Sequence, residues 1–200
     1  MDTRLRILKD AGEMLKHYGI RSVTMEHIAA ELGVSKRTLY EIFSDKDDLV
    51  KQVIEEEIRV HKEYCTKQIE TSENVIEAIF KMGQVNVEMF RKINPLFFAD
   101  LRKFHPGVFR KIQKKGKLKD LSFTKSLFEA GIKDGLFSAN LNIELVSSFV
   151  QKIFDIIHED EFKEFGRENL SNSILLPYFN GIATEKGKNL INKYLDIFKY

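Results

Sequence analysis

The chain has 200 residues, of which 43% are hydrophobic and 31% are charged, with a formal net charge of +2. This balance is typical of a soluble globular protein with one large or two small domains, and it excludes collagenous, disordered and membrane proteins. A single cysteine excludes an intramolecular disulfide framework, and charged residues stand near the N-terminus where a signal peptide would need an apolar segment, so we expect a cytoplasmic protein.

Three short helices are predicted at the start of the chain. Apolar residues at helical spacing indicate a first helix over residues 4–18, which Gly19 would close. Residues 24–43 read TMEHIAAELGVSKRTLYEIF and fit the twenty-residue pattern of a helix-turn-helix. Such a motif needs apolar side chains where two helices cross, a small residue where their backbones approach, and a residue that tolerates positive φ in the turn. These places are filled by Ile28, Leu32, Val34, Leu39 and Ile42, by Ala29, and by Gly33.

The second helix of the motif is expected to enter the major groove of DNA. Ser35 would cap this helix. The side chains that then point away from the helix crossing suit phosphates and base edges, and they are Lys36, Arg37, Thr38, Tyr40 and Glu41. A helix corner in a purely structural bundle could share the same spacing, which is the alternative interpretation.

Charge is balanced in this region. Residues 1–52 contain nine Lys and Arg and nine Asp and Glu. Any basic surface must therefore come from the arrangement of the charges, and we expect modest non-specific affinity for DNA.

The remaining chain is predicted to be helical throughout. Ser44, followed three residues later by Asp47, is a capping-box pattern that would start a connecting helix running to about Thr71. The predicted fold class is all-α, with a helix-turn-helix DNA-binding domain over residues 1–46 and a larger helical domain over residues 47–200. Further helices are expected over residues 73–93, 95–104, 106–134, 142–159, 167–182 and 184–198.

Phenylalanine is concentrated in the larger region, since only Phe43 of the 16 phenylalanines lies before residue 80. Filling of the core is the ordinary interpretation of such residues. The functional alternative is that a subset partly lines a cavity for an apolar ligand. That subset comprises Phe90, Phe97, Phe98, Phe104, Phe123, Phe128, Phe149 and Phe154.

Other candidate sites are weaker. His61 and Cys65 have the i, i+4 spacing of two metal ligands, but no second His or Cys pair completes a metal site, and nothing marks Cys65 as an oxidation sensor. The HEDE run at 158–161 and the lysines within 110–119 are interpreted as solvated faces. No catalytic motif is present, so we expect no enzyme activity, no metal and no cofactor.

The segments RILKDAGEMLKHYG, TMEHIAAELGVSKRTLYEIF and SDKDDL resemble the three-helix DNA-binding domain and the start of the fourth helix in the TetR family of bacterial transcriptional repressors. The resemblance is close over about the first fifty residues, and beyond them it is limited to the number, lengths and order of the helices. It implies a homodimer that binds a double-stranded DNA operator and receives a small hydrophobic ligand.

The resemblance also assigns roles by position. Thr24 and Lys46 would bind phosphates, and the base and backbone contacts would come from Ser35, Lys36, Arg37, Thr38 and Tyr40. Arg37 stands where the family often has Gly or another small residue, and Ile42 stands where it often has an aromatic residue or His. Arg37 is therefore interpreted as a reader of guanine.

Dimerisation in the family implies a four-helix bundle built from the predicted helices 142–159 and 167–182. The expected interface residues are Val146, Val150, Ile153, Ile157, Leu175, Tyr178 and Phe179. The last helix is additional to the family's minimal nine, and its role is open. Two alternatives remain: a DNA-binding regulator without a small-molecule ligand, and a helical protein-interaction module. The sequence does not decide between repressor and activator.

Overall fold

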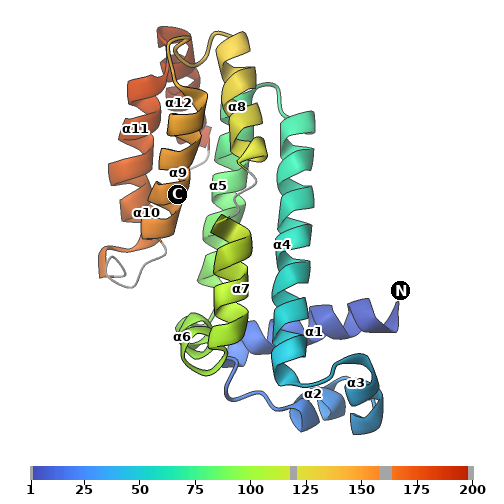
Figure 1. Cartoon of the computed structure of the whole chain (residues 1–200). Helices are drawn as coiled ribbons and strands as arrows, with labels where there is room; N and C mark the ends of the chain where they lie inside the picture. Colours follow the sequence, from blue (N-terminus) through green and yellow to red (C-terminus); the bar gives the residue numbers. More distant parts are fainter. Residues whose placement is uncertain (1, 118–120, 158–163, 198–200) are drawn as a thin grey trace. The chain divides into compact units, whose positions relative to one another are not determined.

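The computed structural model describes residues 2–117, 121–157 and 164–197, and every named element within these ranges is helical (Figure 1). The predicted all-α class is therefore confirmed. The first seven helices are α1 (Thr3–Tyr18), α2 (Met25–Glu31), α3 (Lys36–Ile42), α4 (Lys46–Thr71), α5 (Val75–Arg91), α6 (Pro95–Phe104) and α7 (Pro106–Lys117). They are followed by α8 (Ser122–Lys133), α9 (Ile143–Ile157), α10 (Arg167–Leu170), a π-helical turn (Ser171–Leu175), α11 (Leu176–Ile182) and α12 (Glu185–Ile197).

The helices pack into two compact units. The first unit comprises residues 1–64 and 89–119, and the second comprises residues 65–88 and 120–200. Helices α4 and α5 contribute residues to both units. The boundary predicted after residue 46 separates the residues expected to bind DNA from the rest of the chain. It stays a prediction. Within the described ranges, no helix is both long enough and apolar enough to cross a membrane.

Local hydrogen bonds define the first three helices as predicted. Gly19 ends α1 with a φ of 83°, and Gly33 follows α2 with a φ of 64°, a region that favours glycine. Thr24 caps α2, since its Oγ1 accepts from the His27 N–H over 3.1 Å. Ser35 caps α3, since its Oγ accepts from the Thr38 N–H over 2.9 Å. The turn between α2 and α3 is thus specified by residues within it.

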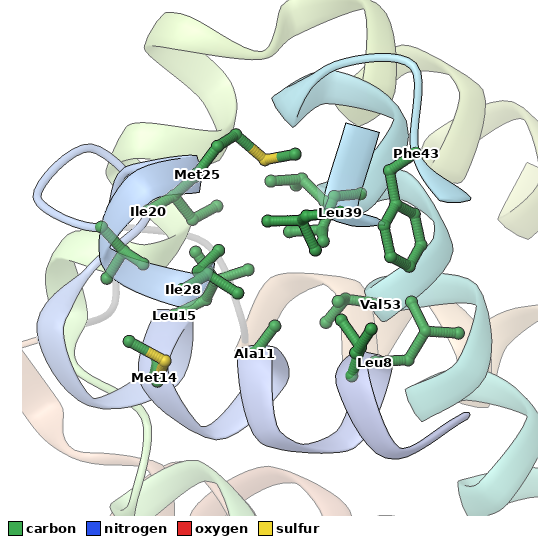
Figure 2. Close-up of a cluster of buried hydrophobic side chains, with 14 of the residues drawn as sticks. Leu8, Ala11, Met14, Leu15, Ile20, Met25, Ile28, Leu39, Phe43 and Val53 are labelled. Carbon is green, nitrogen blue, oxygen red and sulfur yellow. The ribbon is translucent and has the colours of Figure 1, made fainter. Parts of the chain in front are cut away.

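One hydrophobic core joins α1 to α4 (Figure 2). Leu15 of α1, Ile28 of α2, Leu39 of α3 and Phe43 after it are fully buried. Figure 2 shows these side chains pointing toward one another. Each such side chain stabilises the fold by roughly 1.5–3 kcal/mol. The exposed side of α3 is therefore held by a packed layer beneath it.

The cap of α4 differs from the prediction by one residue. Asp45, not Ser44, caps the helix, because its Oδ1 accepts from the Asp48 N–H over 2.8 Å. The Asp48 carboxylate reaches back to the Ser44 N–H over 3.3 Å. Asp47 takes no part in the box, since its Oδ1 lies 2.5 Å from Nδ1 of the buried His105. The expected Ser44–Asp47 capping box was wrong because this tertiary contact draws the Asp47 carboxylate away.

Two predicted helices are divided. The helix expected over residues 106–134 is present as α7 and α8, with residues 118–120 outside the described ranges, and Gly116 lowers helix propensity in the last turn of α7. The helix expected over residues 167–182 contains the π turn just before Leu176 and Pro177. Proline lacks the N–H and clashes with the carbonyl four residues earlier, and a widened turn accommodates both effects.

Helix α6 is joined to α1 and the loop after it within the first unit. The Asn94 N–H donates to the Lys16 carbonyl over 2.8 Å, and the Asn94 Nδ2 donates to the His17 carbonyl over 3.0 Å. The Arg21 N–H donates to Oδ2 of Asp100 over 2.7 Å. Residues from α6 are therefore part of the body that carries the helix-turn-helix.

The last helix is tied into the second unit. Thr184 donates its hydroxyl to the Gly135 carbonyl over 2.7 Å, and the Asn74 Nδ2 donates to the Tyr194 hydroxyl over 3.1 Å. A Cβ at Gly187 would overlap the Leu136 carbonyl oxygen, so the backbones of α12 and the loop after α8 lie in close contact. Helix α12 thus has a structural role that sequence analysis left open.

Candidate DNA-binding surface

The exposed side of α3 presents polar and charged side chains above the buried Leu39. The Arg37 side chain is 89% exposed, and Lys36, Tyr40 and Glu41 are also exposed. Helical spacing explains the exposure of Arg37 and Glu41, because residues two positions from the buried Leu39 lie on the opposite side of the helix. The structure brings together most of the residues predicted to contact bases.

Both cations on this surface have carboxylate partners. The Lys36 ammonium forms an ion pair with Glu26 of α2, which raises the pKa of Lys36 and lowers the pKa of Glu26. The Arg37 Nε donates to Oε1 of Glu41 over 2.8 Å. The Lys36 Nζ also lies 5.8 Å from the centroid of the Tyr40 ring. An anionic ligand must therefore compete with Glu26 and Glu41 for these two cations.

The predicted hydroxyl contacts also serve as helix caps. Ser35 Oγ and Thr38 Oγ1 lie 2.7 Å apart, and either can be the donor. A hydroxyl that accepts a backbone N–H keeps its own hydrogen for donation. The Thr24 hydroxyl hydrogen already interacts with the Glu26 carboxylate, so a phosphate would compete with Glu26 for it, whereas the Ser35 and Thr38 pair retains one donor between them.

Lys46 is in a different environment from Lys36 and Arg37. It is half-buried at the first position of α4, and burial lowers the pKa of its ammonium group, with Asp100 and Asp47 acting in the opposite direction. Two nearby carboxylates would attenuate its attraction for phosphate. Of the predicted basic contacts, Lys46 is the least exposed.

Comparison with known proteins places this surface in a family. Residues 7–53, which include α1, α2, α3 and the start of α4, match the model for bacterial regulatory proteins of the tetR family. Over 101 residues the chain is 37% identical to YvaF of Bacillus subtilis, an uncharacterized HTH-type transcriptional regulator, covering 50% of this chain and 53% of that protein. The aligned part thus spans about half the length of YvaF.

A second HTH-type regulator of Bacillus subtilis, YhgD, also uncharacterized, is 27% identical over 142 residues, covering 68% of this chain and 72% of that protein. A TetR-family transcriptional regulator from Marinobacter aquaeolei has the same fold over 100% of both chains, with a TM-score of 0.66 and 19% identity. The DNA-binding region of the chain, residues 7–53, belongs to the TetR family of transcriptional regulators. This family is non-enzymatic, in agreement with the absence of catalytic motifs from the sequence.

The phenylalanines predicted to line a ligand cavity have several environments in this TetR-family protein. Phe97 is buried in the core of the first unit, where its ring centroid lies 5.3 Å from that of Phe98. Phe128 is buried in the second unit, with its centroid 5.3 Å from that of Phe137. These two residues fit the alternative of core filling.

The other candidate pocket residues are less buried or not described. Phe104 is 39% exposed and Phe149 is 49% exposed, while Phe98 and Phe123 are half-buried. The side chains of Phe90 and Phe154 lie outside the described part of the structure. A ligand site among these residues of the TetR-family chain stays a prediction.

Of the seven residues predicted for the dimer interface, three are buried within their own chain and three, Leu175, Tyr178 and Phe179, are half-buried. Val146, Val150 and Ile153 on α9 are buried, and Ile153 packs in one cluster with Leu170, Ile174, Leu175 and Tyr178. Phe179 packs against the ring of Phe137 within the second unit, with centroids 6.3 Å apart. The side chain of Ile157 lies outside the described part of the structure.

Another side of α9 is exposed instead. Leu145 is 68% exposed, and the Phe149 ring, 49% exposed, lies 5.1 Å from that of Tyr178. Leu145 was absent from the predicted interface of the TetR-family dimer. The i, i+4 spacing of Leu145 and Phe149 is the signal that identifies this second apolar face.

The candidate metal and redox residues remain unsupported. The described residues contain no group of three or more His, Cys, Asp or Glu that could hold a metal ion. Cys65 is buried, and burial raises the pKa of its thiol to about 11. A thiol with so high a pKa is poorly reactive at neutral pH.

Proposed function

We propose that the chain is a homodimeric repressor that binds a palindromic DNA operator and releases it when a small apolar ligand binds. The observation that carries the DNA-binding proposal is the exposed side of α3, where Lys36, Arg37 and Tyr40 project from a helix held by the buried Leu39. In this proposal α3 enters the major groove. A repressor of chromosomal genes would act in the cytoplasm.

Arg37 is the proposed reader of a base. It is the most exposed cation described on α3, and a guanidinium can donate two hydrogen bonds to O6 and N7 of guanine. Its present partner, Glu41, is also exposed, so the pair can open toward DNA without leaving a buried charge. Ser35, Lys36, Thr38 and Tyr40 would make the surrounding base and backbone contacts.

Thr24 and Lys46 are the proposed phosphate contacts. Thr24 would turn its hydroxyl hydrogen from the Glu26 carboxylate to a phosphate oxygen. A phosphate beside Lys46 would favour the charged form of the ammonium group, whose pKa is lowered by burial in the free protein. These two contacts would position the motif without selecting a sequence.

The dimer would hold two copies of α3 roughly 34–36 Å apart, one turn of DNA, so that they fit the two halves of a palindrome. We propose that its interface is built on α9 and α11, where Leu145 and Phe149 are exposed and Tyr178 lies beside Phe149. Exposed apolar residues at helical spacing are typical of a surface that a second helix covers.

The ligand is proposed to bind among the phenylalanines of the larger region and to act through α4. Helix α4 is continuous from the helix-turn-helix into the second unit, so a tilt of α4 would change the separation of the two reading helices. By linkage, ligand and DNA would weaken each other's binding equally, typically by about 1–3 kcal/mol. Burial of Phe97 and Phe128 in the core favours the second candidate, a regulator without a small-molecule ligand.

Selection from random duplex DNA, with purified protein at a stated salt concentration, tests the central proposal. Enrichment of a palindrome is expected. Failure to enrich any sequence would contradict DNA reading and support a protein-interaction module. For the ligand, a panel of hydrophobic compounds is screened by thermal shift and by release of the selected duplex. If no compound stabilises the protein, the ligand-free regulator is the better description.

A further inference from the structure

Basic residues are concentrated in one segment outside the helix-turn-helix. Residues 89–119 contain ten Lys and Arg and a single acidic residue, Asp100, which is a formal charge of +9 in a chain whose net charge is +2. Residues 1–52, by contrast, have equal numbers of basic and acidic residues. The strongest positive charge density therefore belongs to α6, α7 and the residues beside them.

This basic segment belongs to the same compact unit as the helix-turn-helix. Asn94 is hydrogen-bonded to the end of α1, and Asp100 accepts the Arg21 N–H in the loop between α1 and α2. The contact between His105 and Asp47 joins the end of α6 to the first turn of α4. DNA bound to α3 would consequently be bound by the unit that carries the basic segment.

Two cations, Arg21 and Lys103, lie near the same aromatic ring where α6 meets the loop before α2. The Arg21 guanidinium carbon is 4.8 Å from the centroid of the Phe104 ring, and the Lys103 Nζ is 5.4 Å from it. Phe104 is 39% exposed, and Arg21 and Lys103 are also exposed. Cation–π contacts of this kind hold a charge in place while leaving its hydrogens available to an anion.

Four cations of the basic segment, Lys103 among them, are exposed and have no carboxylate partner among the described residues. Among the described residues, Lys92, Lys103, Arg110 and Lys111 are exposed and form no ion pair, whereas Lys36 and Arg37 are each paired with a glutamate. A phosphate can approach these four side chains without displacing a carboxylate. They are better placed to attract the DNA backbone non-specifically than the cations of α3.

We infer that Arg21, Lys92, Lys103, Arg110 and Lys111, the α6–α7 basic face, form a second contact surface for the phosphates of the duplex that α3 reads. The inference rests on the proposed DNA binding. DNA is favoured over a membrane or an acidic protein because the surface adjoins the loop that leads into Thr24, the proposed phosphate contact of α2. Recognition is thereby divided between a neutral motif that reads bases and a basic face that supplies electrostatic affinity.

The salt dependence of binding tests this surface directly. Each phosphate contact contributes about 0.9 to the slope of log K against log salt, so a fourfold rise in salt costs about 3.5-fold in affinity per contact. The variants are Arg21→Gln with Lys103→Gln, and Arg110→Gln with Lys111→Gln. The matched control is Lys133→Gln with Lys193→Gln, which removes two exposed charges from the second unit.

Binding is measured on random-sequence duplex DNA at several salt concentrations, after thermal melting has shown that each variant folds. A lower slope for the two test variants, with the control unchanged, supports the inference. If the unaltered protein binds duplex DNA but both test variants keep its slope, the second surface is refuted while the proposed function stands. Should the unaltered protein bind no duplex, both proposals fail.

Vesicles that contain phosphatidylglycerol provide the competing arm. Charge-dependent binding to these vesicles that the test variants abolish, together with an unchanged slope on DNA, would overturn the inference in favour of a membrane surface.

Discussion

Arg37 lies on an exposed helix face with Glu41 as its partner. Exposed ion pairs contribute about 0–1 kcal/mol, whereas a bidentate contact between arginine and guanine contributes about 1–3 kcal/mol of discrimination. The proposed guanine contact would therefore outweigh the ion pair with Glu41 at the correct base, and the ion pair would persist at other bases. A glutamate beside a base reader thus favours selectivity over general affinity for DNA.

Substitution Arg37→Ala should cost about 1–3 kcal/mol on the selected operator and relax the preference at one base position. The measurement is a titration of the operator and of its single-base variants. Lys46→Ala is the control, since loss of a phosphate contact should weaken binding to every sequence and lower the salt slope by about 1. Equal losses on operator and random DNA for Arg37→Ala would remove its assignment as a base reader.

Cys65 should react slowly with iodoacetamide in the native protein. Its thiol pKa is raised to about 11 by burial, so at pH 8 only about one molecule in a thousand has a thiolate, the reactive form. The rate should rise about tenfold per pH unit between pH 8 and pH 10, provided that the protein remains folded. Protein unfolded in urea is the control and should react faster at pH 8. Fast labelling of the native protein would contradict the burial of this side chain.

Helix α12 illustrates how an added element is joined to a family fold. Its first turn lies against the loop between α8 and α9, where Thr184 donates to the Gly135 carbonyl and Gly187 meets the Leu136 carbonyl. Later in the helix, Ile191 and Tyr194 are buried. The helix is therefore an integral part of the second unit, and the absence of a side chain at Gly187 permits the close approach.

Substitution Gly187→Ala should destabilise the protein by about 1–3 kcal/mol, because the added methyl group overlaps backbone that cannot rotate away. Unfolding in urea, followed by circular dichroism, measures the change. Gly181→Ala is the matched control, since a Cβ at Gly181 in α11 meets nothing within 4 Å. That variant should be stabilised by about 0.5–1 kcal/mol, because alanine favours the helix. Equal stability of both variants would contradict the close packing at Gly187.

For the whole molecule, α9 is the helix on which the proposed assembly depends. One of its sides is buried in the chain by Val146, Val150 and Ile153, while Leu145 and Phe149 remain exposed on another. Packing within its own chain requires only one apolar side of a helix, so the second apolar side of α9 is available to another molecule. The exposed side is the proposed dimer surface, and a dimer is what a palindromic operator requires.

Leu145→Lys combined with Phe149→Lys should convert a dimer into a monomer. The two new lysines of each copy would be buried at the interface, where the two-fold axis would place them against the lysines of the other copy. Sedimentation equilibrium measures the mass, and affinity for the palindrome should fall with dimerisation. Ile58→Lys is the control, since Ile58 is an apolar residue, 52% exposed, on α4. If the double variant stays dimeric, the interface lies elsewhere.

Structural features formed by residues close together in the sequence could be predicted from the sequence alone. Gly33 and Ser35 could be assigned correctly because a turn and a helix cap are made by residues within three or four positions of one another. The family resemblance had the same origin, in the spacing of residues 24–43. The cap of α4 was misassigned for the opposite reason, since His105, 58 positions away, takes the Asp47 side chain.

The tertiary structure alone decided which side chains meet across long separations in the chain. It paired Lys36 with Glu26, placed Arg21 and Lys103 on one ring of Phe104, and buried Val150 rather than Phe149. Helical periodicity shows that α9 has apolar sides, but only packing determines which of them faces the core. The same is true of charge. The composition gives the number of cations in this protein, but only folding decides which of them remain without a carboxylate partner.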